Sequence, residues 1–253
     1  MTKRKILLLA MSLCMVAILA VGGTLAYFTD TDAQTNVFTV GHVAIDLFEN
    51  FGDNDETGIE DLTPVTYNED GTRRQDNVVT KEVYVENTGS KDAYVRVHIA
   101  IPQILDDGAD TFDASANILH FNFEANNAAA GGWDWSDTPG APYTGEWNYY
   151  ETKIGDIVYN VYVVTHEPPV TPGEVTGHAM SQVYMDSDVT NADVTRIKET
   201  LGDEWKIYVV AEAGQVEGFY NAHEALNTQF GVPGKYTVNF TADPEGKTQP
   251  PQE

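Results

Sequence analysis

Apolar and polar residues alternate with a period of two in several segments of this chain, and this pattern limits the possible folds more than any other feature. The clearest case is residues 93–101, in which Tyr94, Arg96 and His98 lie between apolar neighbours. Alternation built from β-branched and aromatic residues predicts strands with one buried face. His98 is therefore expected on an exposed face. The same pattern recurs near residues 43–47, 79–85, 157–163, 207–211 and 236–240.

Turn-forming residues between these segments predict how the strands connect. The stretch 87–92, "NTGSKD", separates two strand patterns, so residues 78–101 are expected to form a hairpin. A second hairpin should turn at residues 155–156, where Gly-Asp interrupts the alternation. Helical spacing of apolar residues, with Asn before and Gly after, predicts two helices over residues 191–202 and 221–231.

Many strands, few helices and no regular alternation of the two predict a mainly β fold. We expect an antiparallel, jelly-roll-like β-sandwich with short helical inserts. Residues 41–242 are expected to form this single domain, and the polar stretch 243–253 a disordered tail.

The first 26 residues have the three parts of a secretory signal peptide. Basic residues 3–5 precede an apolar run over 6–21, and small side chains at Thr24 and Ala26 suit a signal peptidase. We therefore expect cleavage between Ala26 and Tyr27. An uncleaved membrane anchor is the alternative, because the run extended to Ala26 reaches the roughly 20 residues that cross a bilayer.

Cleavage would leave a strongly acidic chain. Three of the 14 basic residues lie in the leader and none of the 39 acidic ones, so the rest would carry a formal charge of −28. Such a charge excludes nonspecific binding to nucleic acid or anionic lipid, which needs basic patches. The sole cysteine, Cys14, also lies in the leader. A secreted product would therefore have no disulfide, and its core alone would have to stabilise it.

Three stretches of the chain carry a resemblance to a known family. They are "GGTLAYFTDTDAQTNVFTVGHVAIDL" at the cleavage site, "KEVYVENTGSKDAYVRVHI" at 81–99 and "VVAEAGQVEGFYNAHEALNTQFG" at 209–231. The first combines a Gly-Gly-Thr-x-Ala end, an aromatic-Thr-Asp start and a later Phe-Thr-x-Gly-x-Val strand. The chain resembles bacterial exported proteins with a SipW-type signal peptide, a group that includes the TasA and camelysin family of biofilm-matrix proteins.

This resemblance implies a dedicated signal peptidase, a jelly-roll domain and a role in extracellular fibres. It also implies that the freed N-terminal segment of one subunit completes the sheet of the next. Carried onto this chain, the donated segment is residues 27–40, and its apolar contacts are Phe28, Val37, Phe38 and Val40. From the residues alone, an alternative stays open: residues 37–48 could form the first strand of the subunit's own sheet.

The camelysin resemblance also raises the question of peptidase activity. Zinc peptidases of the His-Glu-x-x-His type place two histidines one helical turn apart. Here His223 and Glu224 are followed by Asn227 where the second histidine would stand. No Gly-x-Ser-x-Gly motif is present, and a processed chain would have no cysteine. We therefore expect no enzyme.

An acidic stretch is a candidate for weak calcium binding. Asp53, Asp55 and Asp61, with Gly58 between them, follow the first half of an EF-hand loop. Pro64 occupies the twelfth position, where a bidentate Glu would complete the site. A solvated acidic turn is therefore the alternative, and no other cofactor is expected.

An aromatic-rich region suggests a second class of function. Rings exposed on a surface stack against sugars, whereas buried rings merely cover a core. The residues concerned are Trp133, Trp135, Tyr143, Trp147, Tyr149 and Tyr150.

The function expected first is that of a secreted structural protein of a bacterial extracellular matrix or cell surface. It would be a biofilm or fibre subunit, or an accessory, with copies of itself or a related matrix subunit as partners. A secreted carbohydrate- or protein-binding module is the alternative, and a camelysin-type peptidase comes third.

Overall fold

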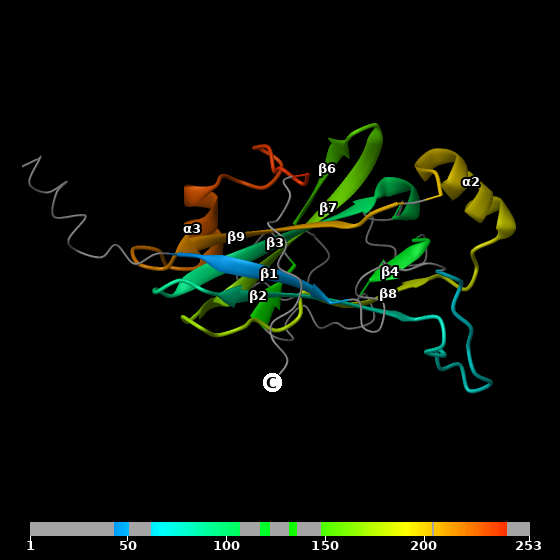
Figure 1. Cartoon of the computed structure of the whole chain (residues 1–253), viewed down its shortest axis with the longest axis horizontal. Helices are drawn as coiled ribbons and strands as arrows, with labels where there is room; N and C mark the ends of the chain where they lie inside the picture. Colours follow the sequence, from blue (N-terminus) through cyan, green and yellow to red (C-terminus); the bar gives the residue numbers. More distant parts are fainter. Residues whose placement is uncertain are drawn as a thin grey trace, which may run out of the picture. The chain divides into compact units, whose positions relative to one another are not determined.

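The computed structural model describes residues 43–50, 62–106, 117–121, 132–135, 148–203 and 205–241. They all belong to one compact unit that begins at Val43. Within these residues the fold is mainly β, as predicted, with two antiparallel sheets and two α-helices (Figure 1). None of the described helices is long and apolar enough to cross a membrane.

The first sheet has four strands in the order β1-β2-β8-β4. Their bounds are Ile45–Asn50 for β1, Val79–Asn87 for β2, Met180–Met185 for β8 and Leu119–Phe121 for β4. β1 pairs with β2 in unbroken register from Ile45 opposite Asn87 to Asn50 opposite Glu82. β1 is thus an edge strand of this sheet.

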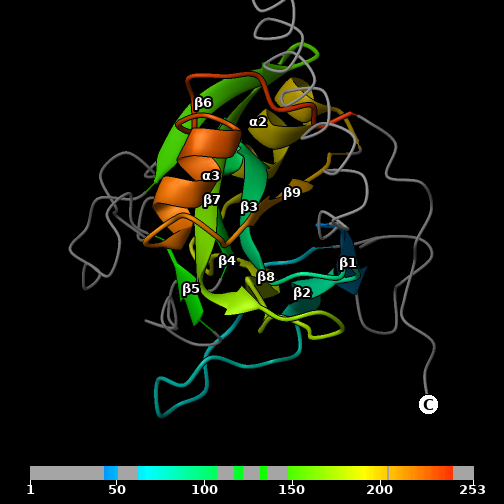
Figure 2. The same cartoon turned by 90° about the vertical axis from the view of Figure 1, so that its left-hand side faces the viewer.

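The second sheet has five strands, of which β9, β3 and β7 form the main body. β5 and β6 both pair with β7, at different positions along its length. The bounds are Tyr208–Gln215 for β9, Ala93–Pro102 for β3, Ile157–Val170 for β7, Trp133–Asp134 for β5 and Tyr149–Ile154 for β6. Figure 2 shows the two sheets as separate layers, with α3 beside the layer that contains β3 and β7.

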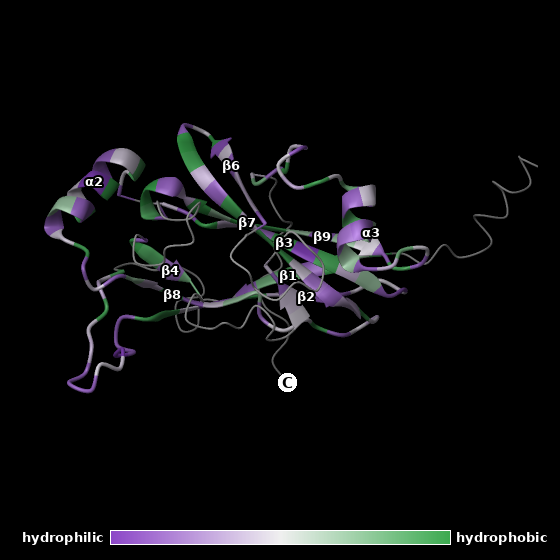
Figure 3. Cartoon of the chain, turned by 180° about the vertical axis from the view of Figure 1, so that it is seen from behind, coloured by the Kyte–Doolittle hydropathy of each residue, from purple (hydrophilic) through white to green (hydrophobic). Residues whose placement is uncertain are grey.

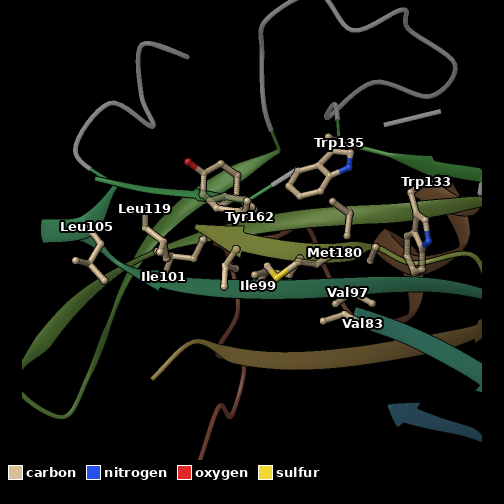
Figure 4. Packing of buried hydrophobic residues seen from close by; sticks show 14 of the residues in the cluster. Val83, Val97, Ile99, Ile101, Leu105, Leu119, Trp133, Trp135, Tyr162 and Met180 are labelled. Atoms are coloured by element: carbon tan, nitrogen blue, oxygen red, sulfur yellow. The ribbon is translucent and has the colours of Figure 1, made fainter. Parts of the chain in front are cut away.

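The main core lies between the two sheets, where the apolar faces of the strands meet. Val97 and Ile99 of β3 pack there with Val83 of β2 and Met180 of β8, and all four are fully buried (Figure 4). Trp133 of β5 is buried in the same cluster. The period-two pattern therefore predicted the inward face of β3 correctly.

The predicted hairpin over residues 78–101 is wrong. Its two halves become β2 and β3, which belong to different sheets. Residues 88–92 thus connect the two layers instead of folding one strand back on the other. The period-two pattern predicts both strands but cannot tell a hairpin from a crossover, because each arrangement buries the same alternate side chains.

The hairpin predicted at residues 155–156 is confirmed. β6 and β7 pair up to Ile154 opposite Ile157, which leaves a two-residue turn. Gly155 has a φ of 62°. Two-residue hairpin loops favour such positive φ angles, which glycine adopts without steric cost.

Both predicted helices are confirmed. α2 runs over Asn191–Leu201 and has a capping box between Thr190 and Asp193, and α3 runs over Ala222–Gln229 with Asn221 as N-cap. α2 carries hydrophilic and hydrophobic residues side by side (Figure 3). Its buried residues, Ile197 and Leu201, join the main core. A short 3₁₀ helix, η2, spans Gln103–Leu105.

The pattern at residues 236–240 does not form a strand. This segment packs instead on the second sheet, where Phe240 is buried with Ala100, Tyr159 and Val161. The second sheet therefore has apolar contacts on both faces. The mainly β sandwich prediction holds, while the jelly-roll topology stays a prediction.

Candidate functional site

Several residues singled out from the sequence lie outside the described residues. The structure therefore leaves their roles as predictions. They are the cleavage pair Ala26 and Tyr27, the assembly contacts Phe28, Val37, Phe38 and Val40, and the calcium candidates Asp53, Asp55 and Asp61.

Two edge strands lie next to each other in the sandwich. β1 ends the first sheet and β9 ends the second, and these two strands contact each other. Among the described residues, no strand pairs with the outer edge of either one. β1 begins at Ile45, close behind the predicted donor segment 27–40. This part of the sandwich thus offers backbone groups that an added strand could pair with.

An ion pair between a buried lysine and a half-buried glutamate holds β1 to its neighbour. Lys81 of β2 is buried and forms a salt bridge with Glu49 of β1. Lys81 lies on the same side of β2 as Val83 and Val85, so its charge points into the sandwich. Because Lys81 lies on the second strand of the sheet, this ion pair fastens the edge strand β1 to the rest of the sheet.

The outer face of the second sheet carries a buried polar cluster, Arg96, His98, Glu212 and Tyr236. Arg96 Nε donates to Glu212 Oε2 at 2.6 Å, and Arg96 Nη2 donates to the Tyr236 hydroxyl at 2.7 Å. That hydroxyl lies 2.8 Å from both carboxylate oxygens of Glu212. His98 Nε2 lies 3.2 Å from Glu212 Oε2. We call these four residues the outer-face cluster.

In this cluster, burial and the neighbouring charges act on each pKa in opposite directions. Burial lowers the pKa of His98, so this imidazole is neutral at neutral pH. Burial alone would raise the pKa of Glu212. Hydrogen bonding from His98 and the positive charge of Arg96 outweigh that effect and lower the pKa of Glu212 to about 2. The cluster therefore holds one buried ion pair, surrounded by neutral hydrogen-bonding groups.

The expectation that His98 is exposed is wrong, because its side chain is fully buried. α3 and the segment around Tyr236 cover the face on which it lies. Arg96 Nη1 also donates to Asn227 of α3, and Nη2 donates to the carbonyl of Gly231. The outer-face cluster thus holds α3 and the segment that follows it against β3.

A second group joins three distant parts of the chain: Asp134 of β5, Glu167 of β7 and His223 of α3. Their ligand-type atoms, one from each, lie within 4.8 Å of one another. His223 Nε2 is 3.2 Å from Glu167 Oε1 and 3.8 Å from Asp134 Oδ2. We call these residues the Asp-Glu-His group.

Strand geometry explains how β5 and β7 bring the two carboxylates together. Trp133 pairs with His166, and Asp134 pairs with Thr165. Trp133 points into the core, where it is almost fully buried and donates to the Gly177 carbonyl at 2.8 Å. Because strand side chains alternate, Asp134 points to the outer face, on which Glu167 also lies.

The first turn of α3 supplies His223, and this helix packs on β3, β7 and β9. Its side chain is 6% exposed, against 13% for Asp134 and 31% for Glu167. Burial alone would lower the pKa of His223, yet the two carboxylates outweigh it and raise that pKa to about 9. An imidazolium between two carboxylates is the resulting state of the group at neutral pH.

The sequence reading of His223 as a remnant of a zinc-peptidase motif missed this arrangement. Asn227, which stands where a second histidine would be, instead accepts a hydrogen bond from Arg96. The partners of His223 come from residues 134 and 167, far away in sequence. The sequence held one signal for Asp134. This residue lies between Trp133 and Trp135, and because side chains alternate along a strand, it should point away from the core that buries the two tryptophans.

The aromatic region does not form one exposed platform in the described residues. Trp133 and Trp135 are both buried in the core. Tyr149 and Tyr150 follow each other on β6, and Tyr149 packs on the core cluster while Tyr150 meets His98 on the other face. Tyr143 and Trp147 lie outside the described residues.

A cavity of about 440 Å³ opens between η2, the β6–β7 hairpin and the end of α2. The residues that line it include Asp106, Glu151, Asp156 and Tyr149. Asp106 is fully buried, and its Oδ2 accepts from the Tyr162 hydroxyl at 2.7 Å. This size suits a small ligand, and the carboxylates favour one with cationic or hydroxyl groups.

Comparison with known proteins gives no match: no family model, no curated protein and no solved structure is significantly similar to this chain.

Proposed function

We propose that this chain is an exported structural protein, a subunit or accessory of an extracellular matrix or surface fibre. After cleavage at Ala26, the segment 27–40 of one copy adds to a sheet edge of the next copy. Such contacts are head-to-tail, so the assembly can grow without closing on itself. The TasA and camelysin resemblance points to the same role.

The observation that carries this proposal is the pair of adjacent edge strands, β1 and β9. In the sequence, β1 begins five residues after the predicted donor segment. Backbone hydrogen bonds to an edge strand supply affinity, and alternate side chains of the added strand supply specificity. Val37, Phe38 and Val40 provide apolar side chains for that purpose, while residues 29–36 are polar enough to act as a tether.

The test uses residues 27–253, made as a fusion from which a protease releases Tyr27 as the first residue. We expect filaments in electron microscopy and fast sedimentation after release, and single particles while the fusion is retained. An extension of equal length placed after Glu253 is the matched control and should not prevent filaments. A released protein that stays monomeric at every concentration would refute the proposal.

A substitution pair separates strand donation from other modes of association. Val37→Asp together with Phe38→Asp should abolish filaments, because charged side chains cannot fill apolar positions of an acceptor sheet. Gln34→Asp, in the polar part of the same segment, should leave filament formation unchanged. Equal filament formation by all three proteins would mean that the segment does not donate a strand.

The cavity lined by Glu151 and Tyr149 favours the alternative function of a secreted binding module. Its carboxylates would pair with the cationic groups of amino sugars. Titration with chito-oligosaccharides of glucosamine, followed by tyrosine and tryptophan fluorescence, tests this function. Binding that Glu151→Gln weakens would support it, and no fluorescence change would argue against it.

A further inference from the structure

We propose that Asp134, Glu167 and His223 form a site for one divalent transition-metal ion of the zinc class, which clamps β5 and β7 to α3. This site is separate from the edge strands that the fibre proposal uses, and from the acidic stretch at residues 53–61. The site would use one imidazole nitrogen from α3 and two carboxylate oxygens, one from β5 and one from β7.

The spacing of the three donor atoms fits a small metal ion. Two ligands at the usual zinc distances of 2.0–2.1 Å, set at the tetrahedral angle, lie about 3.3 Å apart. The measured distances from His223 Nε2 are 3.2 Å to Glu167 Oε1 and 3.8 Å to Asp134 Oδ2. The two carboxylate oxygens lie within 4.8 Å of each other. Side-chain movements that bring the three separations towards about 3.3 Å would complete three metal bonds.

The hydrogen bonding of His223 supports the same conclusion. His223 Nε2 and Glu167 Oε1 are buried atoms, and their contact lacks the alignment of a hydrogen bond. Buried polar atoms normally have such a partner, so two that face each other without one call for an explanation. A metal ion between them would satisfy both, because each would then donate a lone pair to it.

Charge balance favours a divalent ion. The two carboxylates together carry a formal charge of −2, which one bound divalent ion brings to zero. Removing an uncompensated charge from a largely buried site is favourable. The overall excess of acidic residues, which gives a formal charge of −25, adds to the attraction for cations.

The donor set decides the class of metal. Calcium and magnesium prefer sites made of oxygen alone, and calcium takes six to eight such ligands. An imidazole with two carboxylates is instead typical of zinc, manganese or iron, and three protein ligands leave a position for water. Among zinc, manganese and iron at equal concentrations, we expect zinc to bind most tightly. Calcium should compete poorly.

The test measures zinc binding to untagged residues 27–253 by equilibrium dialysis and by thermal unfolding. We expect about one equivalent of bound zinc and a rise of about 5–10 °C in Tm at a hundredfold excess over Kd. Millimolar calcium should neither displace the zinc nor reproduce this shift. The absence of retained zinc at micromolar concentration would overturn the proposal.

Variants assign the binding to these three residues. Glu167→Gln and His223→Gln should each weaken zinc binding by at least about tenfold, because both remove a direct ligand. Glu167 is the more exposed of the two, so its variant should fold even if the His223 variant does not. His178→Gln is the matched control, since His178 is exposed and faces a single carboxylate, Glu82, at 3.8 Å. Unchanged zinc affinity in folded Glu167→Gln would refute the site.

Discussion

Arg96 and Glu212 stand directly opposite each other on β3 and β9, and Arg96 Nε lies 2.6 Å from Glu212 Oε2. The same guanidinium reaches Asn227 of α3, the Gly231 carbonyl and the Tyr236 hydroxyl. One buried cation therefore joins β9, α3 and the following segment to the central strand. This arrangement explains how α3 and the segment after it cover the outer face of the second sheet.

Replacing Arg96 by Met should destabilise the fold strongly. The change leaves the carboxylate of Glu212 buried without its cation, and breaking a buried pair in this way costs about 3–5 kcal/mol. The free energy of unfolding, measured by urea denaturation of residues 27–253, checks this. Arg74→Met is the control, because Arg74 and Asp76 form an exposed pair and should contribute at most about 0.5 kcal/mol. Similar losses in both variants would contradict the assigned role of Arg96.

Glu212 should make the fold sensitive to acid. Its folded pKa of about 2 lies below the ordinary value of 4.5, so protons bind preferentially to the unfolded chain. The contribution of Glu212 is therefore complete above pH 4.5 and is lost as the pH falls towards 2. The shift corresponds to about 3 kcal/mol.

His98 should extend this acid sensitivity to higher pH. Its pKa is lowered by burial, so the unfolded chain takes up a proton below pH 6.5 while the folded form resists it.

The groups that face Glu212 are Arg96, His98, Tyr236 and Tyr150. Urea denaturation at several pH values should show a shallower decline between pH 4.5 and 2 in Glu212→Gln than in the native chain. Parallel curves would contradict the low pKa of Glu212.

Gly132→Ala should loosen β5. Gly132 has a φ of 85°, and a Cβ there would lie 2.9 Å from His166 Nε2 and from Pro168 Cδ. Gly173 has a φ of 80° but no neighbour within 4 Å of its Cβ position, so Gly173→Ala should cost only about 1–2 kcal/mol of backbone strain. We expect Gly132→Ala to cost about 1–3 kcal/mol more, through overpacking. Thermal unfolding compares the stability of the two variants. Equal losses of stability would mean that β5 moves aside for the added methyl group at no cost in free energy.

Trp133→Ala should remove the anchor of β5. The ring is almost fully buried and donates to the Gly177 carbonyl, so its loss should cost about 3–5 kcal/mol. Urea denaturation measures this cost. Tyr220→Ala is the control, because Tyr220 is 94% exposed and its truncation should change stability by less than about 0.5 kcal/mol. A small effect of Trp133→Ala would show that β5 is held by other contacts.

Some features of the fold could be predicted because they depend on neighbouring residues alone. The inward face of β3, the Gly155 turn, and the helices over Asn191–Leu201 and Ala222–Gln229 all follow from local period or turn chemistry. The outer-face cluster could not be predicted. His98 and Glu212 are 114 positions apart, and a period of two cannot indicate that a helix and a later segment will cover a polar face.

By itself, the amino-acid sequence determined that this chain is built from strands with one apolar face and two capped helices. Only the tertiary structure decided which sheet each strand joins, and which polar residues meet. β2 and β3 are neighbours in sequence but lie in different sheets, whereas Asp134, Glu167 and His223 are distant and meet. The physical reason is that periodicity acts between adjacent residues, while pairing and burial depend on packing over the whole sandwich.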